Sequence, residues 1–135
     1  GTIYIPDTKN KEPLTLPLSD VLIGILNYRL RFKINDYVFS SRKSQYFAYP
    51  EKALKHLTET SGIKFTFHDL RRTFITVAES LDISSYAIKR LVNHKNGNDV
   101  TEGYIIANHD RLRAPMQRIT DFFKESCNIE MDDYV

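Results

Sequence analysis

The pattern of apolar and polar positions predicts a short β-hairpin at the start of the chain and a series of helices after it. Thr2–Ile5 and Leu14–Leu16 are β-type runs, and the segment 6–13 between them is rich in turn-forming residues. Further along, apolar residues recur at helical spacing in segments bounded by residues that favour helix ends. The predicted fold class is therefore mainly α with a small N-terminal β-hairpin, an α+β domain spanning residues 1–135.

Two helices are expected between the hairpin and residue 62. Ser19 is suited to cap a helix that runs to about Phe32. The predicted inward face of this helix consists of Leu22, Ile25, Leu26 and Phe32. Residues 33–49 lack periodicity and are predicted mainly as a loop. Pro50 then favours the first turn of a helix that Gly62 ends.

A third predicted helix begins with Thr66 and Asp69, which resemble a capping box with Asp in place of the better Glu. Its core face is expected to consist of Leu70, Phe74, Val77, Ala78 and Leu81. His68 and Arg71 would lie together on the flank of that face, near the helix N-terminus. A helix start favours phosphate, because its free N–H groups and its dipole attract negative charge.

Three more helices are predicted toward the C-terminus. Ser84 is suited to cap a short helix that the polar run 95–98 ends. A second short helix from residue 99 to about residue 107 would carry Tyr104, and a last one would run from Asp110 to about Glu125. The residues expected to face inward from the first and last of these helices are Ile88, Leu91, Val92, Leu112, Met116, Ile119, Phe122 and Phe123.

Charge and cysteine content narrow the class of protein. The net charge of +2 is uneven: residues 121–135 have a balance of −4, which leaves +6 on the rest. A basic body with an acidic tail is compatible with a polyanionic partner, and equally with an ordinary solvated surface. The single cysteine, Cys127, excludes an intrachain disulfide and fits a reducing cytosol. No apolar run is long enough to span a membrane, so no membrane association is expected.

Five residues spread along the chain have side chains that could together cleave a phosphodiester bond without a metal ion. Such cleavage needs a nucleophile, donors for the charge on the non-bridging oxygens, and an acid for the leaving oxygen. Tyr104 offers a nucleophilic hydroxyl, and Arg71 offers a planar fork that matches two phosphate oxygens. His68 and His94 can donate to phosphate or accept a proton, and Lys9 at the hairpin tip can protonate the 5′ oxygen. No residues have the spacing of a metal cluster, and neither a metal nor another cofactor is expected.

The same segments resemble the catalytic domain of a tyrosine recombinase of the phage-integrase family. The resemblance rests on the ordered runs HDLRRTF at 68–74, LVNH at 91–94 and DVTEGY at 99–104. The hairpin, with TKNK at 8–11 followed by LPLS at 16–19, is similar to the lysine hairpin of that family and the start of its next helix. The run RLRAPMQRI at 111–119 is similar to the tail of prophage-type integrases, so the resemblance covers nearly the whole chain.

The resemblance implies a catalytic role for each matched position. Tyr104 would form a covalent 3′-phosphotyrosyl link to DNA, and a second strand's 5′ hydroxyl would then reseal the backbone without ATP. Arg71 would be the second of two phosphate-clamping arginines, and His68 would serve as general base or donor. His94 would fill a position where the family has His or Trp. Lys9 would be the general acid.

The resemblance also implies the partners and the setting. Lys11 is the second choice for the general acid, and Lys11, Arg72 and Lys95 are expected to contact DNA. The partner would be double-stranded DNA at attachment sites, on which the full-length protein would form a homotetramer. The expected location is the cytoplasm of a bacterial host, with the gene carried by a prophage or another mobile element.

Two departures from the family pattern bear on activity. The family's other catalytic arginine lies upstream of the lysine hairpin, and no Arg precedes Lys9 here. The 135 residues are therefore expected to be a catalytic-domain fragment of a longer integrase, without the N-terminal DNA-binding region and inactive alone. In addition, Asn93 replaces the glycine that the family has just before the second His, which would change that turn.

The chemistry-bearing residues also have simpler interpretations. A helix-turn-helix DNA-binding module would use the stretch 73–92, with Ser85, Tyr86 and Lys89 facing the major groove. In that hypothesis His68 and Tyr104 are incidental. Taken singly, His68 and His94 could form only local hydrogen bonds, and Lys9 could be a solvated turn residue. A type IB topoisomerase-like enzyme would share the recombinase chemistry. Replacement of Tyr104 by Phe separates a binding module, which should tolerate it, from an enzyme that depends on the hydroxyl.

Overall fold

The computed structural model describes residues 1–41, 45–46, 50–94 and 109–128. Within these residues the chain begins with the predicted hairpin, in which β1 (Thr2–Ile5) pairs antiparallel with β2 (Leu14–Pro17). Thr2 lies opposite Pro17, and Ile5 lies opposite Leu14. Helices follow, so the predicted class of a mainly α domain with an N-terminal hairpin is confirmed in its general form.

Helix α1 (Asp20–Leu30) begins where the sequence predicts. The Ser19 hydroxyl accepts a hydrogen bond from the Leu22 N–H at 3.5 Å, and Ser19 itself is buried. The predicted inward face is wrong at both ends, because Leu22 is 36% exposed and Phe32 is 64% exposed. Val21 is the buried residue of this helix. Leu22 lies about 100° round the helix from the buried Val21, and Phe32 lies beyond the last residue of α1. The first turn of α1 is bonded to α5, where the Gln117 side chain forms hydrogen bonds with Asp20.

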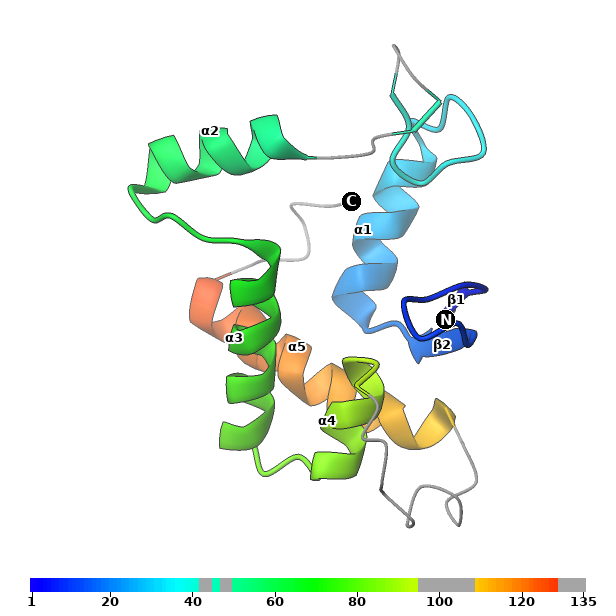
Figure 1. The fold of residues 1–135 in the computed structure, drawn as a ribbon, viewed down its shortest axis with the longest axis vertical. Coiled ribbons are helices and arrows are strands. Elements are labelled where there is room, and N and C mark those ends of the chain that lie inside the picture. The colour runs from blue at the N-terminus through cyan, green and yellow to red at the C-terminus, as the bar shows by residue number, and fades with distance from the viewer. Residues whose placement is uncertain (42–44, 47–49, 95–108, 129–135) are drawn as a thin grey trace.

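Helix α2 (Glu51–Ser61) follows Pro50, which lies one position before the helix instead of in its first turn. Gly62 ends the helix as predicted, with the left-handed φ of 70° that glycine adopts readily. None of the residues of α2 is buried. Figure 1 shows this helix apart from the group formed by α3, α4 and α5.

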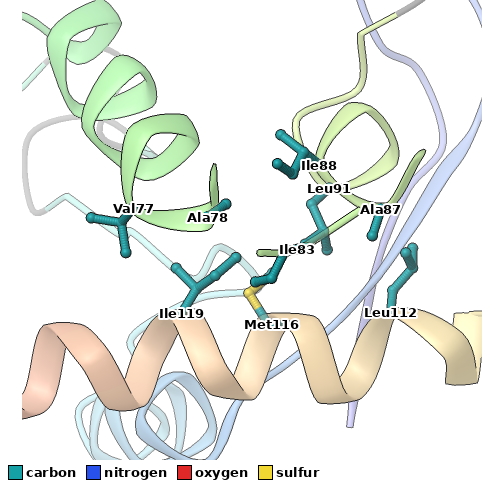
Figure 2. Packing of buried hydrophobic residues seen from close by; sticks show 9 residues of the cluster. All are labelled: Val77, Ala78, Ile83, Ala87, Ile88, Leu91, Leu112, Met116 and Ile119. Carbon is teal, nitrogen blue, oxygen red and sulfur yellow. The ribbon is translucent and has the colours of Figure 1, made fainter. Parts of the chain in front are cut away.

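The core of the described chain lies where α3 (Phe67–Ser80), α4 (Ser85–Leu91) and α5 (Arg113–Cys127) meet, with the 3₁₀ helix η2 (His109–Leu112) leading into α5. Figure 2 shows apolar side chains of these helices pointing toward one another. The buried cluster consists of Val77, Ala78, Ile83, Ala87, Ile88, Leu91, Leu112, Met116 and Ile119. Phe74, Leu81 and Phe123 are partly buried against it. Apart from Ala87 and Ile83, all of these are residues that the helical spacing marks as inward-facing.

Leu70 and Phe122 are the exceptions among the core residues predicted for α3, α4 and α5. Leu70 is 50% exposed, although it lies on the same side of α3 as Phe74 and Val77. It precedes Val77 by about 10 Å along the helix axis, whereas α5 covers the part of α3 around Val77 and Ala78 (Figure 2). Phe122 is 37% exposed near the end of α5. None of the helices within the described ranges is long and apolar enough to cross a membrane.

Candidate functional site

The start of α3 is fixed by a reciprocal capping box between Thr66 and Asp69. The Asp69 N–H donates to the Thr66 hydroxyl oxygen at 3.3 Å, and the Thr66 N–H donates to the Asp69 carboxylate at 2.9 Å. The Thr66 hydroxyl also donates to that carboxylate at 2.7 Å. The box holds the first turn of the helix although few apolar contacts cover this end.

His68 and Arg71 lie one turn apart on this fixed helix start, as predicted from their spacing. His68 is exposed and Arg71 is half-buried, while Arg72 next to it is exposed. Among the described residues, the Arg71 side chain has no hydrogen-bond or ion-pair partner. A half-buried guanidinium in this state is suited to bind an anion such as a phosphate.

The surroundings of Asp69 at the start of α3 favour the ionised form of its carboxyl group. The pKa of Asp69 is lowered, first by hydrogen bonds from the Thr66 side chain and backbone, and then by the nearby charges of Arg72 and His68. Asp69 is therefore ionised in its capping role at neutral pH. The Asp69 carboxylate accepts hydrogen bonds from the Thr66 N–H and hydroxyl. Arg71 makes no ion pair with it.

The hairpin tip that carries Lys9 is a tight turn held by its own hydrogen bonds. The Lys11 N–H donates to the Thr8 carbonyl at 2.8 Å, and the Thr8 hydroxyl donates to the Glu12 carbonyl at 2.9 Å. The Asn10 N–H donates to the Thr8 hydroxyl at 3.2 Å. Lys9 and Lys11 both project from this turn as exposed residues.

His94 lies three residues after Leu91, the last residue of α4, and completes a Schellman turn there. The His94 N–H donates to the Lys89 carbonyl at 2.9 Å, and the Asn93 N–H donates to the Arg90 carbonyl at 3.2 Å. Asn93 has a left-handed φ of 50°. Glycine is the usual residue at this left-handed position and asparagine is the next best. The expectation that Asn93 changes the turn relative to the family's glycine stays a prediction.

A contact between residues 83 positions apart joins these two turns. The Asn10 side-chain amide donates to the Asn93 backbone carbonyl at 3.1 Å and to the Asn93 side-chain oxygen at 3.3 Å. Both asparagines are half-buried. The residue after Lys9 is thereby bonded to the residue before His94. Asn10 was not predicted as a site residue, because only its place beside Lys9 in a turn distinguished it.

The remaining candidate residues are not joined to this contact by the described part of the chain. Within it, no hydrogen bond or ion pair links His68 or Arg71 to Lys9 or His94. Tyr104 and Lys95 lie outside the described residues, as does the short helix expected around Tyr104. The structure therefore groups the candidates into two parts, the start of α3 and the paired turns of Lys9 and His94.

The α3–α4 pair gives limited support to the helix-turn-helix alternative. Of the three residues expected to face a DNA groove, Ser85 is exposed, whereas Tyr86 and Lys89 are half-buried. Tyr86 helps to line a pocket whose other walls include Leu14, Thr15 and Leu112, and the Arg90 guanidinium lies 5.8 Å from its ring centre. Tyr86 thus faces the protein's own hairpin and η2.

Comparison with known families decides the classification. The model of the phage integrase family matches residues 1–111. The chain belongs to the phage integrase family. No curated protein and no solved structure matches the chain. Membership of the phage integrase family points to site-specific DNA recombination in general and to DNA as the substrate. All eight candidate catalytic and DNA-contacting residues of this integrase-family chain fall within the matched region.

Proposed function

We propose that this chain is the catalytic domain of a tyrosine recombinase, which cleaves and rejoins DNA at specific sites without a metal ion. The observation that carries the proposal is the family match together with the paired turns of Lys9 and His94. Two candidate residues far apart in sequence are linked through their immediate neighbours, as one active site requires. A helix-turn-helix module would have no need of this link.

In the proposed reaction the Tyr104 hydroxyl oxygen attacks the phosphorus and the bond from phosphorus to the 5′ oxygen breaks. The tyrosine proton passes to His68 acting as general base, and the Lys9 ammonium donates a proton to the leaving 5′ oxygen. The products are a 3′-phosphotyrosyl link and a free 5′ hydroxyl. Attack by the 5′ hydroxyl of another strand reverses these steps and releases the tyrosine.

Arg71 and His94 would stabilise the negative charge that develops on the non-bridging oxygens. Arg71 is suited to this because its guanidinium is half-buried at the start of α3 and has no partner among the described residues. Donors already in place cost no reorganisation when charge develops, and removal of one such donor commonly slows a reaction about 10²- to 10³-fold.

The DNA contacts outside the reacting phosphate are proposed for Lys11, Arg72 and Lys95. Lys11 and Arg72 are exposed and can reach backbone phosphates. We further propose that the full-length protein acts as a tetramer on paired attachment sites, and that it does so in the cytoplasm of a bacterial host.

The test uses the full-length protein and nicked suicide duplexes tiled across DNA that flanks the gene. After cleavage the short 5′-hydroxyl fragment diffuses away, so a covalent protein–DNA complex accumulates and is seen on a denaturing gel. We expect this complex with the wild type and with Tyr86→Phe, the matched control, but not with Tyr104→Phe. Binding to DNA with no covalent complex on any duplex would favour the binding-module alternative.

A further inference from the structure

We propose that Asn93 and Asn10 form a clamp that positions Lys9 for proton donation to the leaving 5′ oxygen. This inference rests on the proposed function and concerns how its general acid is held. Neither asparagine would touch the DNA or the reacting atoms, so both are positioning residues. They act through the turn on which Lys9 lies.

The clamp joins two turns that are each rigid by themselves. The Lys9 turn is closed by the bond from the Lys11 N–H to the Thr8 carbonyl, and the Asn93 turn by the bond from the His94 N–H to the Lys89 carbonyl. Within either turn, neighbouring residues keep a fixed relation to each other. A bond between Asn10 and Asn93 therefore determines where the backbone of Lys9 lies relative to that of His94.

The amide of Asn10 is chemically matched to this task. Its nitrogen carries two hydrogens, and it lies 3.1 Å from the Asn93 carbonyl and 3.3 Å from the Asn93 side-chain oxygen. Both partners are acceptors, so the donor cannot be exchanged for a carboxylate without loss. Half-burial of the two asparagines limits the access of competing water.

Asn93 has a left-handed conformation, so comparison with glycine shows what its side chain adds. Glycine would suit the φ of 50° better and would keep the backbone carbonyl that Asn10 also uses. Glycine would lack the side-chain oxygen that accepts the second bond. Asparagine at this position therefore adds a specific contact to the hairpin at some cost in backbone preference.

The most informative variant is Asn93→Gly. It removes the side-chain oxygen that accepts from Asn10, and glycine adopts the existing left-handed φ readily. Asn128→Gly is the matched control, since Asn128 ends α5 with a φ of 49° and is exposed. Asn10→Asp retains the shape of the side chain but replaces the donor by an oxygen that faces two acceptors. Lys9→Ala shows what complete loss of the proposed acid does.

The readout is the single-turnover rate of covalent complex formation by the full-length protein, at saturating protein so that DNA affinity does not enter. Each variant is assayed on a normal suicide duplex and on one whose scissile 5′ oxygen is replaced by sulfur. A thiol is far more acidic than an alcohol, so a thiolate leaves without protonation. Loss of a correctly placed acid slows cleavage of the oxygen substrate and spares the sulfur substrate.

We expect Asn93→Gly to slow cleavage of the oxygen substrate about 3- to 10-fold, the size of one net hydrogen bond. Asn10→Asp should slow it about tenfold or more, because both bonds are lost. Both variants and Lys9→Ala should cleave the sulfur substrate at close to the wild-type rate, and Asn128→Gly should match the wild type on both substrates. This pattern would support the clamp.

Two results would overturn the clamp while leaving the proposed function intact. One is an unchanged rate of Asn93→Gly and Asn10→Asp on the oxygen substrate. The other is an equal loss on both substrates, which indicates a general structural effect. Failure of the wild type to form a covalent complex with either substrate would instead contradict the proposed function itself.

Discussion

The two halves of α3 differ in what holds them in place. The C-terminal half packs Val77 and Ala78 against Ile119 of α5, in the most buried part of the described chain (Figure 2). The N-terminal half has Leu70 half-exposed and depends on the hydrogen bonds between Thr66 and Asp69. Arg71, which is proposed to bind the reacting phosphate, and His68, the proposed general base, lie on this N-terminal half. The difference implies that stability and the proposed chemistry can be perturbed separately along one helix.

The largest loss of stability should come from the packed half. Ile119→Ala removes a fully buried side chain at the contact with α3 and should lower the free energy of unfolding by about 2–5 kcal/mol. Urea denaturation of the two proteins measures this difference. Leu70→Ala is the control on the other half and should change the free energy of unfolding by only about 0.5 kcal/mol. Equal losses for the two variants would contradict the contrast between the halves.

Within α3, the larger loss of activity should come from the capped half. Arg71→Ala in the full-length protein should reduce transition-state stabilisation by about 2–4 kcal/mol, because one charged donor to the phosphate is lost. Rates of covalent complex formation on suicide duplexes measure the effect, and urea denaturation should show little change in stability. Arg72→Ala, one position along and exposed, should weaken DNA binding but slow cleavage far less. Similar cleavage by both variants would remove Arg71 from its proposed role.

A smaller effect on stability is expected at the cap itself. Thr66→Ala removes the hydroxyl that accepts from the Asp69 N–H and should lower the free energy of unfolding by about 1 kcal/mol. Thr76→Ala, in the exposed middle of the same helix, is the matched control and should be close to neutral. A neutral Thr66→Ala would mean that packing, not capping, holds the start of α3.

The smallest effect concerns pH. The pKa of Asp69 is lowered from its ordinary value of 3.8 by the Thr66 hydrogen bonds. Its ionised form therefore stabilises the folded state fully above that value, and this stabilisation is lost as the pH falls through the lower folded value. Asp69→Asn should be less stable than the wild type at pH 7, and the gap should narrow below pH 3.8. Denaturation curves at several pH values measure this gap. If ionised Asp69 instead destabilised the folded state, the wild type would gain stability relative to the variant as the pH falls.

Local sequence signals predicted much of the fold. Ser19, Thr66 and Ser84 each cap a helix through a hydrogen bond to a residue three positions on, so the neighbouring sequence is enough to locate the helix starts. Gly62 likewise ends α2 through its own backbone preference. These signals do not depend on the rest of the molecule, so the sequence alone is enough to recognise them.

Burial and pairing depend on distant parts of the chain, and there the sequence was less informative. Leu70 and Leu22 have the spacing of core residues, but α5 covers only part of α3, and α1 turns Val21 inward instead of Leu22. The bond from Asn10 to Asn93 spans 83 positions, and neither residue has a local pattern that predicts it. The spacing of His68 and Arg71 on one helix was predictable, whereas their relation to Lys9 and His94 required tertiary structure.

The identity of the nucleophile is tested most directly by mapping the covalent complex formed by the full-length protein. Trypsin cuts after Lys95 and Arg111, so the peptide 96–111 contains a single tyrosine, Tyr104. After nuclease digestion, mass spectrometry should find this peptide carrying a nucleotide remnant on Tyr104. A covalent complex whose remnant lies on another residue would contradict the assignment of Tyr104 as nucleophile.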